Sequence, residues 1–313
     1  MRVFLMRNFR ITKMLLRPLH LFPIRILAAF AVAAALPSGA WGTDRAPAGD
    51  WCKRLTGRLP GVTRVDCEKS GLASAGVQSR RGFPILVREL APPAGAGAVP
   101  SRRILVIGGI HGDELTASSI VFKWLPRMQA QDAAHLHWKV VPVANPDGLL
   151  AARPQRVNAG GVDLNRNFPT PGWHREAPRY WTRVTGRDPR RFPGRSPLSE
   201  PESRWLNDQI EGFRPHLIVS IHAPFGVLDL DGPAPAPRRF GSLTYDPVGI
   251  YPGSLGNYGG RHKNIPVLTV ELPHAWNLPP EAEVTRIWVD MLAWIRTSRV
   301  AGPVPIPPEA AQG

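Results

Sequence analysis

The stretch Ile104-Leu105-Val106-Ile107-Gly108-Gly109-Ile110-His111-Gly112-Asp113-Glu114 is an apolar run that ends on two side chains able to bind a metal, spaced i, i+3. A β-branched run closed by Gly-Gly predicts a buried strand, and the helical periodicity that begins at Glu114 predicts a helix directly after it. His111 and Glu114 should therefore lie together at the carboxyl end of a strand. Ligand sites in open α/β sheets collect at that end.

The same patterns predict further elements along the chain. Strands are expected over residues 83–90, 104–110, 138–144, 216–222 and 267–272, and helices over 114–128, 199–213 and 281–297. Because strands and helices alternate, we expect an α/β fold with a mixed, largely parallel central sheet flanked by helices on both faces.

One helix start and one long loop are also predicted. Ser199 and Glu202 have the spacing of a capping box, so we expect Ser199 to cap the helix that follows. Residues 145–199 are rich in Pro, Gly and Arg and lack sustained periodicity, which predicts a loop. A loop of this length inside a compact domain is usually functional.

The first 42 residues have the pattern of a signal peptide. Six basic residues and no acidic residue occur in residues 1–25, and the apolar run 26–36 is followed by the small residues of 37–42. That run is too short to cross a hydrocarbon core of about 30 Å, which needs about 20 residues. We therefore expect cleavage, no stable membrane anchor afterwards, and a periplasmic or secreted protein.

The two cysteines of the chain, Cys52 and Cys67, lie shortly after this segment. In an exported protein two neighbouring cysteines predict a disulfide. We therefore expect a disulfide-pinned N-terminal lead-in over residues 43–82, a catalytic domain over 83–300 and a Pro-rich tail over 301–313.

The charge of the chain does not indicate a nucleic-acid partner. The net charge is +15, and six of the positive charges lie in the expected signal peptide, which leaves +9 for the rest. No nucleic-acid-binding motif accompanies the basic residues. They are interpreted as a solvated surface or as a field that steers an anionic substrate such as a cell-wall polymer. The sequence does not indicate an oligomeric state.

Three predicted strands end on side chains with metal or acid–base chemistry. The first carries His111 and Glu114, the second ends on His222, and the third ends on Glu271. Two imidazoles and one carboxylate leave a coordination position open, which is typical of a catalytic zinc, here one per chain. A second carboxylate outside the metal shell could then serve as general base. Taken singly, His222 could instead be a core histidine and Glu271 a buried ion-pair partner.

The long loop carries groups suited to a substrate. Arg166 beside Asn165 offers a planar guanidinium and an amide, a combination expected to bind a substrate carboxylate. Arg156 could stabilise the negative charge that develops on a scissile carbonyl.

Together these segments resemble, in order, the motif series of the zinc carboxypeptidase family over roughly residues 83–297. The matching motifs are His111-Gly-Asp-Glu114, Asn145-Pro-Asp-Gly148, Gly161-Val-Asp-Leu-Asn-Arg-Asn-Phe168, Ser199-Glu-Pro-Glu202, Ser220-Ile-His222 and Thr269-Val-Glu-Leu272. Within the family the chain looks most like the murein peptide amidase A branch, partly through Pro252-Gly253-Ser254-Leu255-Gly256.

The resemblance implies roles for the zinc ligands and their neighbours. His111, Glu114 and His222 would bind zinc, and Glu271 would deprotonate the water and protonate the leaving amine. Asp163 resembles the family's carboxylate partner of the first histidine ligand, which fixes the imidazole tautomer.

It also implies roles for the substrate-binding residues. Asn165 and Arg166 would hold the free carboxylate of the terminal residue, and Arg156 would polarise the carbonyl, with Arg153 as its competitor for that role. Tyr251 is the candidate for the family's substrate-capping tyrosine, and Tyr258 is its rival.

The resemblance leads to a functional expectation. We expect an exported zinc metallopeptidase that hydrolyses an amide bond near the free carboxylate of a cell-wall peptide, at a γ-D-glutamyl–diaminopimelate bond. One alternative is an N-acyl amino acid deacylase like succinylglutamate desuccinylase and aspartoacylase. A second is a non-catalytic peptidoglycan-binding module, and a third is a non-haem iron site built on two histidines and a carboxylate.

Overall fold

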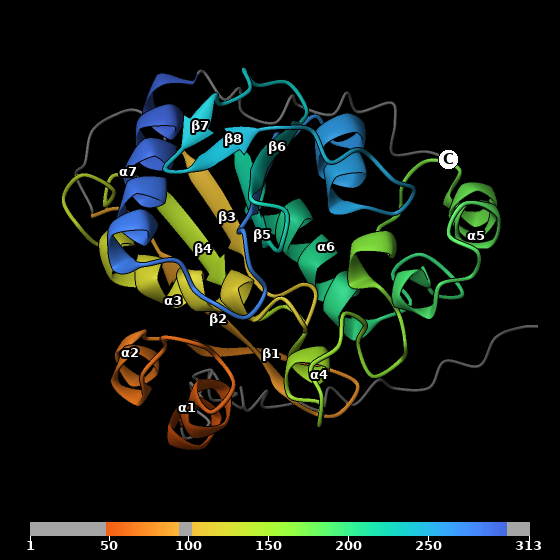
Figure 1. Cartoon of the computed structure of the whole chain (residues 1–313), viewed down its shortest axis with the longest axis horizontal. Helices are drawn as coiled ribbons and strands as arrows, with labels where there is room; N and C mark the ends of the chain where they lie inside the picture. Colours follow the sequence, from red (N-terminus) through yellow and green to blue (C-terminus); the bar gives the residue numbers. More distant parts are fainter. Residues whose placement is uncertain (1–47, 94–101, 299–313) are drawn as a thin grey trace, which may run out of the picture. The chain divides into compact units, whose positions relative to one another are not determined.

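A nine-stranded mixed sheet forms the centre of the computed structural model, which describes residues 48–93 and 102–298. In order along the sheet the strands are β1 (Ala73–Gln78), β2 (Pro84–Leu90), β4 (His137–Val141), β3 (Arg103–Ile107), β5 (Leu217–His222), β9 (Val267–Glu271), β6 (Val227–Asp231), β8 (Leu243–Tyr245) and β7 (Arg239–Phe240) (Figure 1). The expected signal peptide, residues 1–42, and the expected tail, residues 301–313, lie outside the described residues.

The central strands β4, β3, β5 and β9 pair in parallel, and antiparallel strands β2 and β6 flank them. The predicted mixed α/β sheet with helices on both faces is therefore confirmed, with the parallel pairing concentrated at its centre. The short strands β6, β7 and β8 were not expected, because they lie in a segment with little sustained apolar alternation.

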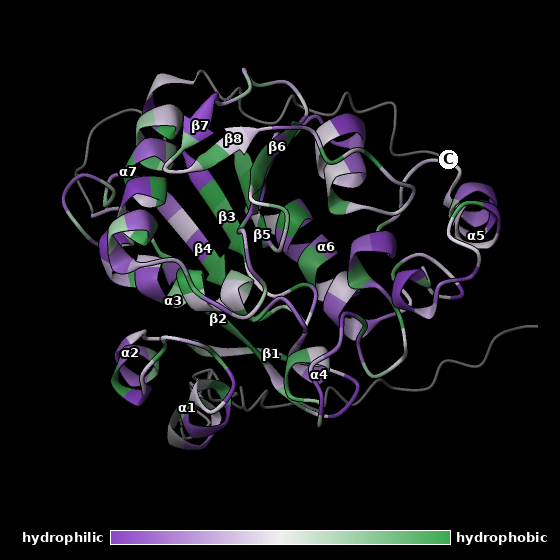
Figure 2. Cartoon of the chain, in the orientation of Figure 1, coloured by the Kyte–Doolittle hydropathy of each residue, from purple (hydrophilic) through white to green (hydrophobic). Residues whose placement is uncertain are grey.

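Alternate residues of the central strands pack on opposite faces of the sheet, as the period of two in a strand requires. On one face, residues such as Val106, Val219 and Val270 pack with helices α3 (Leu115–Met128) and α7 (Glu281–Thr297). On the other face, Leu105 and Ile218 pack with helix α6 (Pro201–Phe213) and with the turn η3 (Gly256–His262). Figure 2 shows hydrophobic and hydrophilic residues alternating along α7, as expected of a helix with one buried side.

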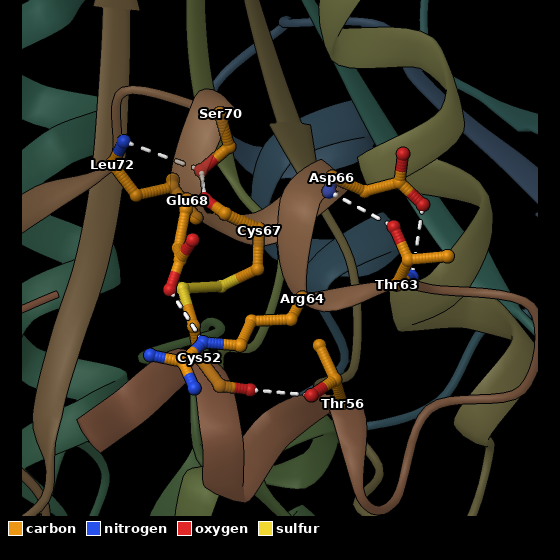
Figure 3. Close-up of a disulfide and its surroundings, with 9 residues drawn as sticks. All are labelled: Cys52, Thr56, Thr63, Arg64, Asp66, Cys67, Glu68, Ser70 and Leu72. Atoms are coloured by element: carbon orange, nitrogen blue, oxygen red, sulfur yellow. Dashed lines mark hydrogen bonds and ion pairs between the residues drawn. A yellow bond between two sulfur atoms is a disulfide. The ribbon is translucent and has the colours of Figure 1, made fainter. Parts of the chain in front are cut away.

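The segment 48–78 is built into the same sheet as the expected catalytic domain. It forms helix α1 (Ala48–Thr56), helix α2 (Arg64–Lys69) and the edge strand β1, which pairs with β2. Cys52 and Cys67 are joined by a disulfide between α1 and α2, and both pack in the apolar cluster that contains Val106 (Figure 3).

Two local expectations were wrong. Helix α6 begins at Pro201 with Glu200 as its N-cap residue, and no side chain caps it, so Ser199 and Glu202 form no capping box. Proline at the first helical position needs no hydrogen-bond acceptor for its nitrogen, which shifts the start of the helix. The second wrong expectation is the long loop: residues 145–199 contain several short helices.

The regular elements of this long segment are α4 (Pro146–Leu149), η1 (Leu164–Arg166), α5 (Trp173–Arg183) and η2 (Pro189–Arg191). In α5 only Trp173 and Ala177 are buried, so the helix leaves no apolar stripe in the sequence. Among the described residues, no helix has the length and apolar character needed to cross a membrane.

Removing the disulfide should destabilise the protein without moving the sheet. The bond closes a loop of 15 residues, for which the chain-entropy model gives about 3 kcal/mol. We expect the double variant Cys52→Ser/Cys67→Ser to lose roughly that free energy of unfolding in urea titrations. Reduction of the unmodified protein should give the same loss. Equal unfolding midpoints for the oxidised protein and the double variant would contradict the prediction.

Candidate active site

The polar side chains predicted at strand ends meet at one edge of the sheet. His111 follows β3, His222 is the last residue of β5, and Glu271 is the last residue of β9. In the parallel register of β5 and β9, His222 lies opposite Glu271. Glu114 reaches the same place because it is the N-cap residue of α3, directly after the turn that follows His111.

A close backbone contact fixes that turn. Gly112 lies against the turn at Gly148, and a Cβ atom on Gly112 would be 2.3 Å from the backbone nitrogen of Leu149. The backbone nitrogen of Gly112 also donates to the carbonyl oxygen of Arg156, at 3.4 Å. Glycine is required here because no side chain fits between the two turns.

His111, Glu114 and His222 present their donor atoms to a common point. Oε1 of Glu114 is 2.8 Å from Nδ1 of His111, Oε2 is 3.0 Å from Nδ1 of His222, and the two Nδ1 atoms are 3.2 Å apart. Donors bound at zinc–ligand distances in a tetrahedron are roughly 3.3 Å from one another. The three buried groups therefore fit a zinc ion, which both imidazoles would hold through Nδ1.

The second ring nitrogen of each histidine, Nε2, also has a hydrogen-bonding partner. Nε2 of His111 is 3.1 Å from Oδ1 of Asp163, and Nε2 of His222 is 2.9 Å from Oγ of Ser220. Such outer partners orient the imidazole rings and select their tautomers. The contribution of Ser220 was not predicted, although its position two residues before His222 on the same strand places it on the same face.

Asp163 connects several parts of the site. Its carboxylate contacts His111, accepts from Nε of Arg156 at 2.9 Å and accepts from the backbone nitrogen of Asn165 at 3.0 Å. Burial alone would raise the pKa of Asp163, but attraction to Arg156 and His111 outweighs it and lowers the pKa well below its ordinary value. Asp163 is therefore an anion that ties the metal-binding residues to the segment carrying Asn165.

Arg156 and its competitor Arg153 lie in different surroundings. Arg156 lines the cleft beside the metal-binding residues, and its Nη1 is 3.3 Å from Oε1 of Glu114. Its carbonyl oxygen accepts from the side-chain amide of Asn145 at 3.0 Å. Arg153 is exposed and is not among the residues that line the cleft.

Arg166, Asn165 and Tyr251 form the next part of the cleft wall. The guanidinium of Arg166 lies over the ring of Tyr251, 4.4 Å from its centroid. Asn165 accepts through Oδ1 from the backbone nitrogen of Leu255, at 2.8 Å, so its NH₂ group is the half of the amide that remains as a donor. The rival tyrosine, Tyr258, is buried away from the cleft.

Glu271 lines the cleft next to the metal-binding residues. Its side chain is buried, and its Oε2 atom has no hydrogen-bond partner among the described residues. Burial raises the pKa of Glu271 above its ordinary value. A carboxylate with an unused oxygen and a raised pKa is suited to accept a proton from a nearby group.

One cleft of about 470 Å³ brings these residues together. The predicted residues that line it are His111, Glu114, Arg156, Asn165, Arg166, His222, Tyr251 and Glu271. Cys52 and Cys67 lie elsewhere. Sequence reasoning missed Asp229 and Asp231 of β6, which also line the cleft. The pattern Asp-Leu-Asp in a strand was the signal that could have identified them, because it places two carboxylates on one face.

A buried acidic cluster outside the cleft, formed by Glu200 and Glu202, holds the loop segment that carries Asn158. Asn158 donates from Nδ2 to Glu200 at 2.8 Å and to Glu202 at 3.1 Å, and Arg80 forms an ion pair with Glu200. Oε1 of Glu202 has no partner among the described residues. Burial, together with the nearby Asp147 and Glu200, raises the pKa of Glu202 to about 7.

The raised pKa predicts a pH-dependent loss of stability. Between the ordinary value of 4.5 and about 7, the folded protein keeps a proton on Glu202 that the unfolded chain releases. The free energy of unfolding therefore falls as pH rises through this window and stays lower above it. We expect Glu202→Gln to remove this loss, making the variant more stable by roughly 1 to 3 kcal/mol at about pH 8 and nearly unchanged at about pH 4.5.

Urea unfolding of both proteins across this pH range measures the effect. Asp208→Asn, at an exposed carboxylate on the same helix, is the matched control and should show no such difference. A constant difference between Glu202→Gln and the unmodified protein at all pH values would rule out the titration of Glu202 as its cause.

Comparison with known proteins places these observations in a family. The family model described as zinc carboxypeptidase matches residues 54–227. Murein peptide amidase A of Vibrio campbellii is 33% identical over 180 residues, which cover 55% of this chain and 69% of that protein. Murein peptide amidase A of Escherichia coli K12 is 35% identical over 127 residues, 40% of this chain and 50% of that protein.

Solved structures agree at the level of the fold. The crystal structure of thrombin activatable fibrinolysis inhibitor superposes with a TM-score of 0.56 over 79% of this chain and 70% of that chain, at 17% identity. At this identity the similarity concerns the arrangement of sheet and helices alone.

Proposed function

The chain belongs to the zinc carboxypeptidase family, and on this premise we propose that it is a periplasmic or secreted zinc metallopeptidase that cleaves an amide bond next to the free carboxylate of a peptide. It is a hydrolase. The observation that supports the proposal most is the meeting of three metal-binding side chains, a partnerless carboxylate and a buried arginine in one cleft. They are His111, Glu114, His222, Glu271 and Arg166.

The donor set suits zinc, with His111 and His222 binding through Nδ1 and Glu114 through its carboxylate. When bound there, zinc supplies a Lewis acid that polarises a carbonyl and lowers the pKa of a coordinated water toward about 7. Asp163 and Ser220 keep the two imidazoles oriented for this task.

Glu271 is the proposed general base. Its Oε2 atom would accept a proton from the attacking water in the cleft and then deliver that proton to the nitrogen of the leaving amine. The raised pKa makes Glu271 a stronger base than an ordinary carboxylate, which favours the first of these transfers. A non-catalytic binding module would not need a general base next to the three metal-binding side chains, so the position of Glu271 favours the enzyme.

Arg156 and Arg166 are proposed to act on the substrate. Arg156 lies beside Glu114, where its guanidinium would stabilise the negative charge that develops on the scissile carbonyl oxygen. Arg166, together with the NH₂ group of Asn165, would hold the free carboxylate of the terminal residue. Tyr251, stacked on Arg166, would cover this end of the substrate.

The proposed substrate is a peptidoglycan stem peptide, cleaved at a γ-D-glutamyl–diaminopimelate bond. Two relatives are named murein peptide amidase A, which points to this class of peptide. The proposed export rests on the sequence of residues 1–42. An N-acyl amino acid deacylase is the alternative, and parallel assays of stem peptides and N-acyl amino acids separate the two.

Replacing the general base should separate binding from catalysis. We expect Glu271→Gln to bind one zinc per chain like the unmodified protein and to lose at least about 100-fold in kcat. His111→Ala is the matched variant, because it should lose zinc while its circular dichroism spectrum stays that of the folded protein. The measurements are metal content by mass spectrometry and hydrolysis of a stem peptide. Full activity of Glu271→Gln would exclude the proposed role.

The proposed carboxylate clamp makes a second prediction. A stem peptide amidated at the terminal carboxylate loses its charge-assisted contact with Arg166, so we expect kcat/KM to fall on the order of 10- to 100-fold. Arg166→Gln should lower the turnover of the free peptide and abolish the difference. Arg183→Gln, at an exposed arginine on α5, is the charge control. Equal turnover of free and amidated peptide by the unmodified protein would contradict the clamp.

A further inference from the structure

Two carboxylates in the wall of the cleft have no role in the chemistry described above. Asp229 and Asp231 belong to β6 and line the cleft, yet their side chains are only 3% and 7% exposed. Buried carboxylates are costly unless an opposite charge or several hydrogen-bond donors compensate them. The groups that compensate the buried charge of Asp229 and Asp231 could therefore belong to a ligand.

Neither carboxylate forms an ion pair among the described residues, and the attraction of Arg261 does not offset the burial that raises the pKa of Asp231. Asp229 accepts a hydrogen bond from the backbone nitrogen of its neighbour Leu230, at 2.7 Å, and another from the backbone of Val248. The side chain of Asp231 accepts no hydrogen bond from the described residues. Other buried carboxylates differ, because Asp163 is paired with Arg156 and Glu200 with Arg80.

The strand register directs the pair toward the reaction centre. Asp229 lies opposite Thr269 on the antiparallel strand β9, and Glu271 is two residues further along β9. Asp229, Thr269 and Glu271 all line the cleft, as the alternation of side chains in a strand requires. Diagonal neighbours across two such strands are roughly 7–8 Å apart, and their Cβ atoms are somewhat closer, so Asp229 and Glu271 are near neighbours on one face of the sheet.

The backbone around Asp231 leaves its carboxylate accessible from the cleft. Gly256 also lines the cleft, and a Cβ atom on it would be 1.9 Å from Oδ2 of Asp231. Any side chain at this position would occupy the space over the carboxylate. The glycine therefore keeps open the approach of a ligand group to Asp231.

The cleft contains groups of both charge signs: Arg166 on one side and the carboxyl groups of Asp229 and Asp231 on the other. Arg166 is buried and pairs with no carboxylate among the described residues, and its Nη1 donates to the carbonyl oxygen of Asn165 at 2.6 Å. The cleft thus has a cationic group at one place and a pair of carboxyl groups at another, and neither forms an ion pair with the described chain. A ligand that carries both charges would compensate both.

We propose that Asp229 and Asp231 bind a side-chain ammonium of the residue that hydrolysis releases. This inference rests on the proposed function, in which Arg166 holds the free carboxylate of that same residue. The substrate class is a peptide that ends in a diamino acid, such as lysine, ornithine or diaminopimelate. Burial, followed by the charge of Asp229, raises the pKa of Asp231 to about 7 against the attraction of Arg261, and a bound ammonium would lower that pKa by favouring the charged carboxylate.

Matched substrates test the proposal with the zinc-loaded full protein. One pair is alanyl-γ-D-glutamyl-lysine and the same peptide ending in norleucine; the other pair ends in diaminopimelate and in 2-aminopimelate. Within each pair only the side-chain ammonium differs. We expect kcat/KM to be higher for the ammonium-bearing peptide on the order of 10- to 100-fold, the worth of a charge-assisted hydrogen bond.

Variants assign the preference to the two residues. In Asp229→Asn/Asp231→Asn the ratio within each pair should fall to near one. Asp208→Asn, which removes an exposed carboxylate on α6 outside the cleft, is the control and should keep the ratio of the unmodified protein. Thermal unfolding of all variants verifies that they are folded.

The outcomes distinguish this inference from the proposed function. Hydrolysis of all four peptides without preference would overturn the ammonium site and leave the peptidase intact. Hydrolysis of none would overturn the peptidase. In that case calorimetric titration of the unmodified protein with lysine and with norleucine tests the ammonium site directly. Equal binding of the two amino acids would overturn it, and a tighter complex with lysine, lost in the double variant, would support it.

Discussion

The carboxylate of Asp163 is the contact on which the rest of the site depends. It is fully buried and holds three groups from different parts of the chain: the far nitrogen of His111, the guanidinium of Arg156 and the backbone nitrogen of Asn165. A buried anion is stable only when its acceptor positions are satisfied and its charge is compensated. The contacts that compensate Asp163 also orient three groups: the ring of His111, the guanidinium of Arg156 and the turn that carries Arg166. One desolvated charge therefore couples the end of the cleft proposed to bind the metal to the end proposed to bind the substrate.

The sheet supplies the fixed frame for this network. His222 and Glu271 are neighbours because β5 and β9 run in parallel and in register, and a shift of one residue would turn both side chains to the opposite, apolar face. The apolar residues between them, such as Val219 and Val270, are buried against α3 and α7 and oppose that shift. The core of the fold thus determines the spacing of the reacting groups, and the close contact at Gly112 extends that precision to Glu114.

The sequence predicts the parts of this arrangement that leave a periodic signal. Continuous apolar runs identify the central strands, and the polar residues that end them identify His111, His222 and Glu271. Helix α5 leaves no such signal, because only Trp173 and Ala177 of it are buried. The start of α6 was misplaced because the pattern Ser199 to Glu202 looks like a capping box, whereas the carboxylates of this segment are taken up by Asn158 and Arg80. Such long-range competition for a side chain cannot be derived from local spacing.

Asp229 and Asp231 could not be recognised from local sequence patterns, because their significance depends on burial. In the sequence, Asp-Leu-Asp is an ordinary alternation, and an exposed edge strand would carry it at no cost. Burial in the cleft changes its meaning, because the two desolvated carboxyl groups and the desolvated Arg166 line one cleft and form no ion pair with the described chain. Such groups lose stability in the free protein and regain it when a ligand of matching charge is bound. The imbalance of buried charge, more than the size of the cleft, is therefore the basis of the proposed preference for a terminal residue with a side-chain ammonium.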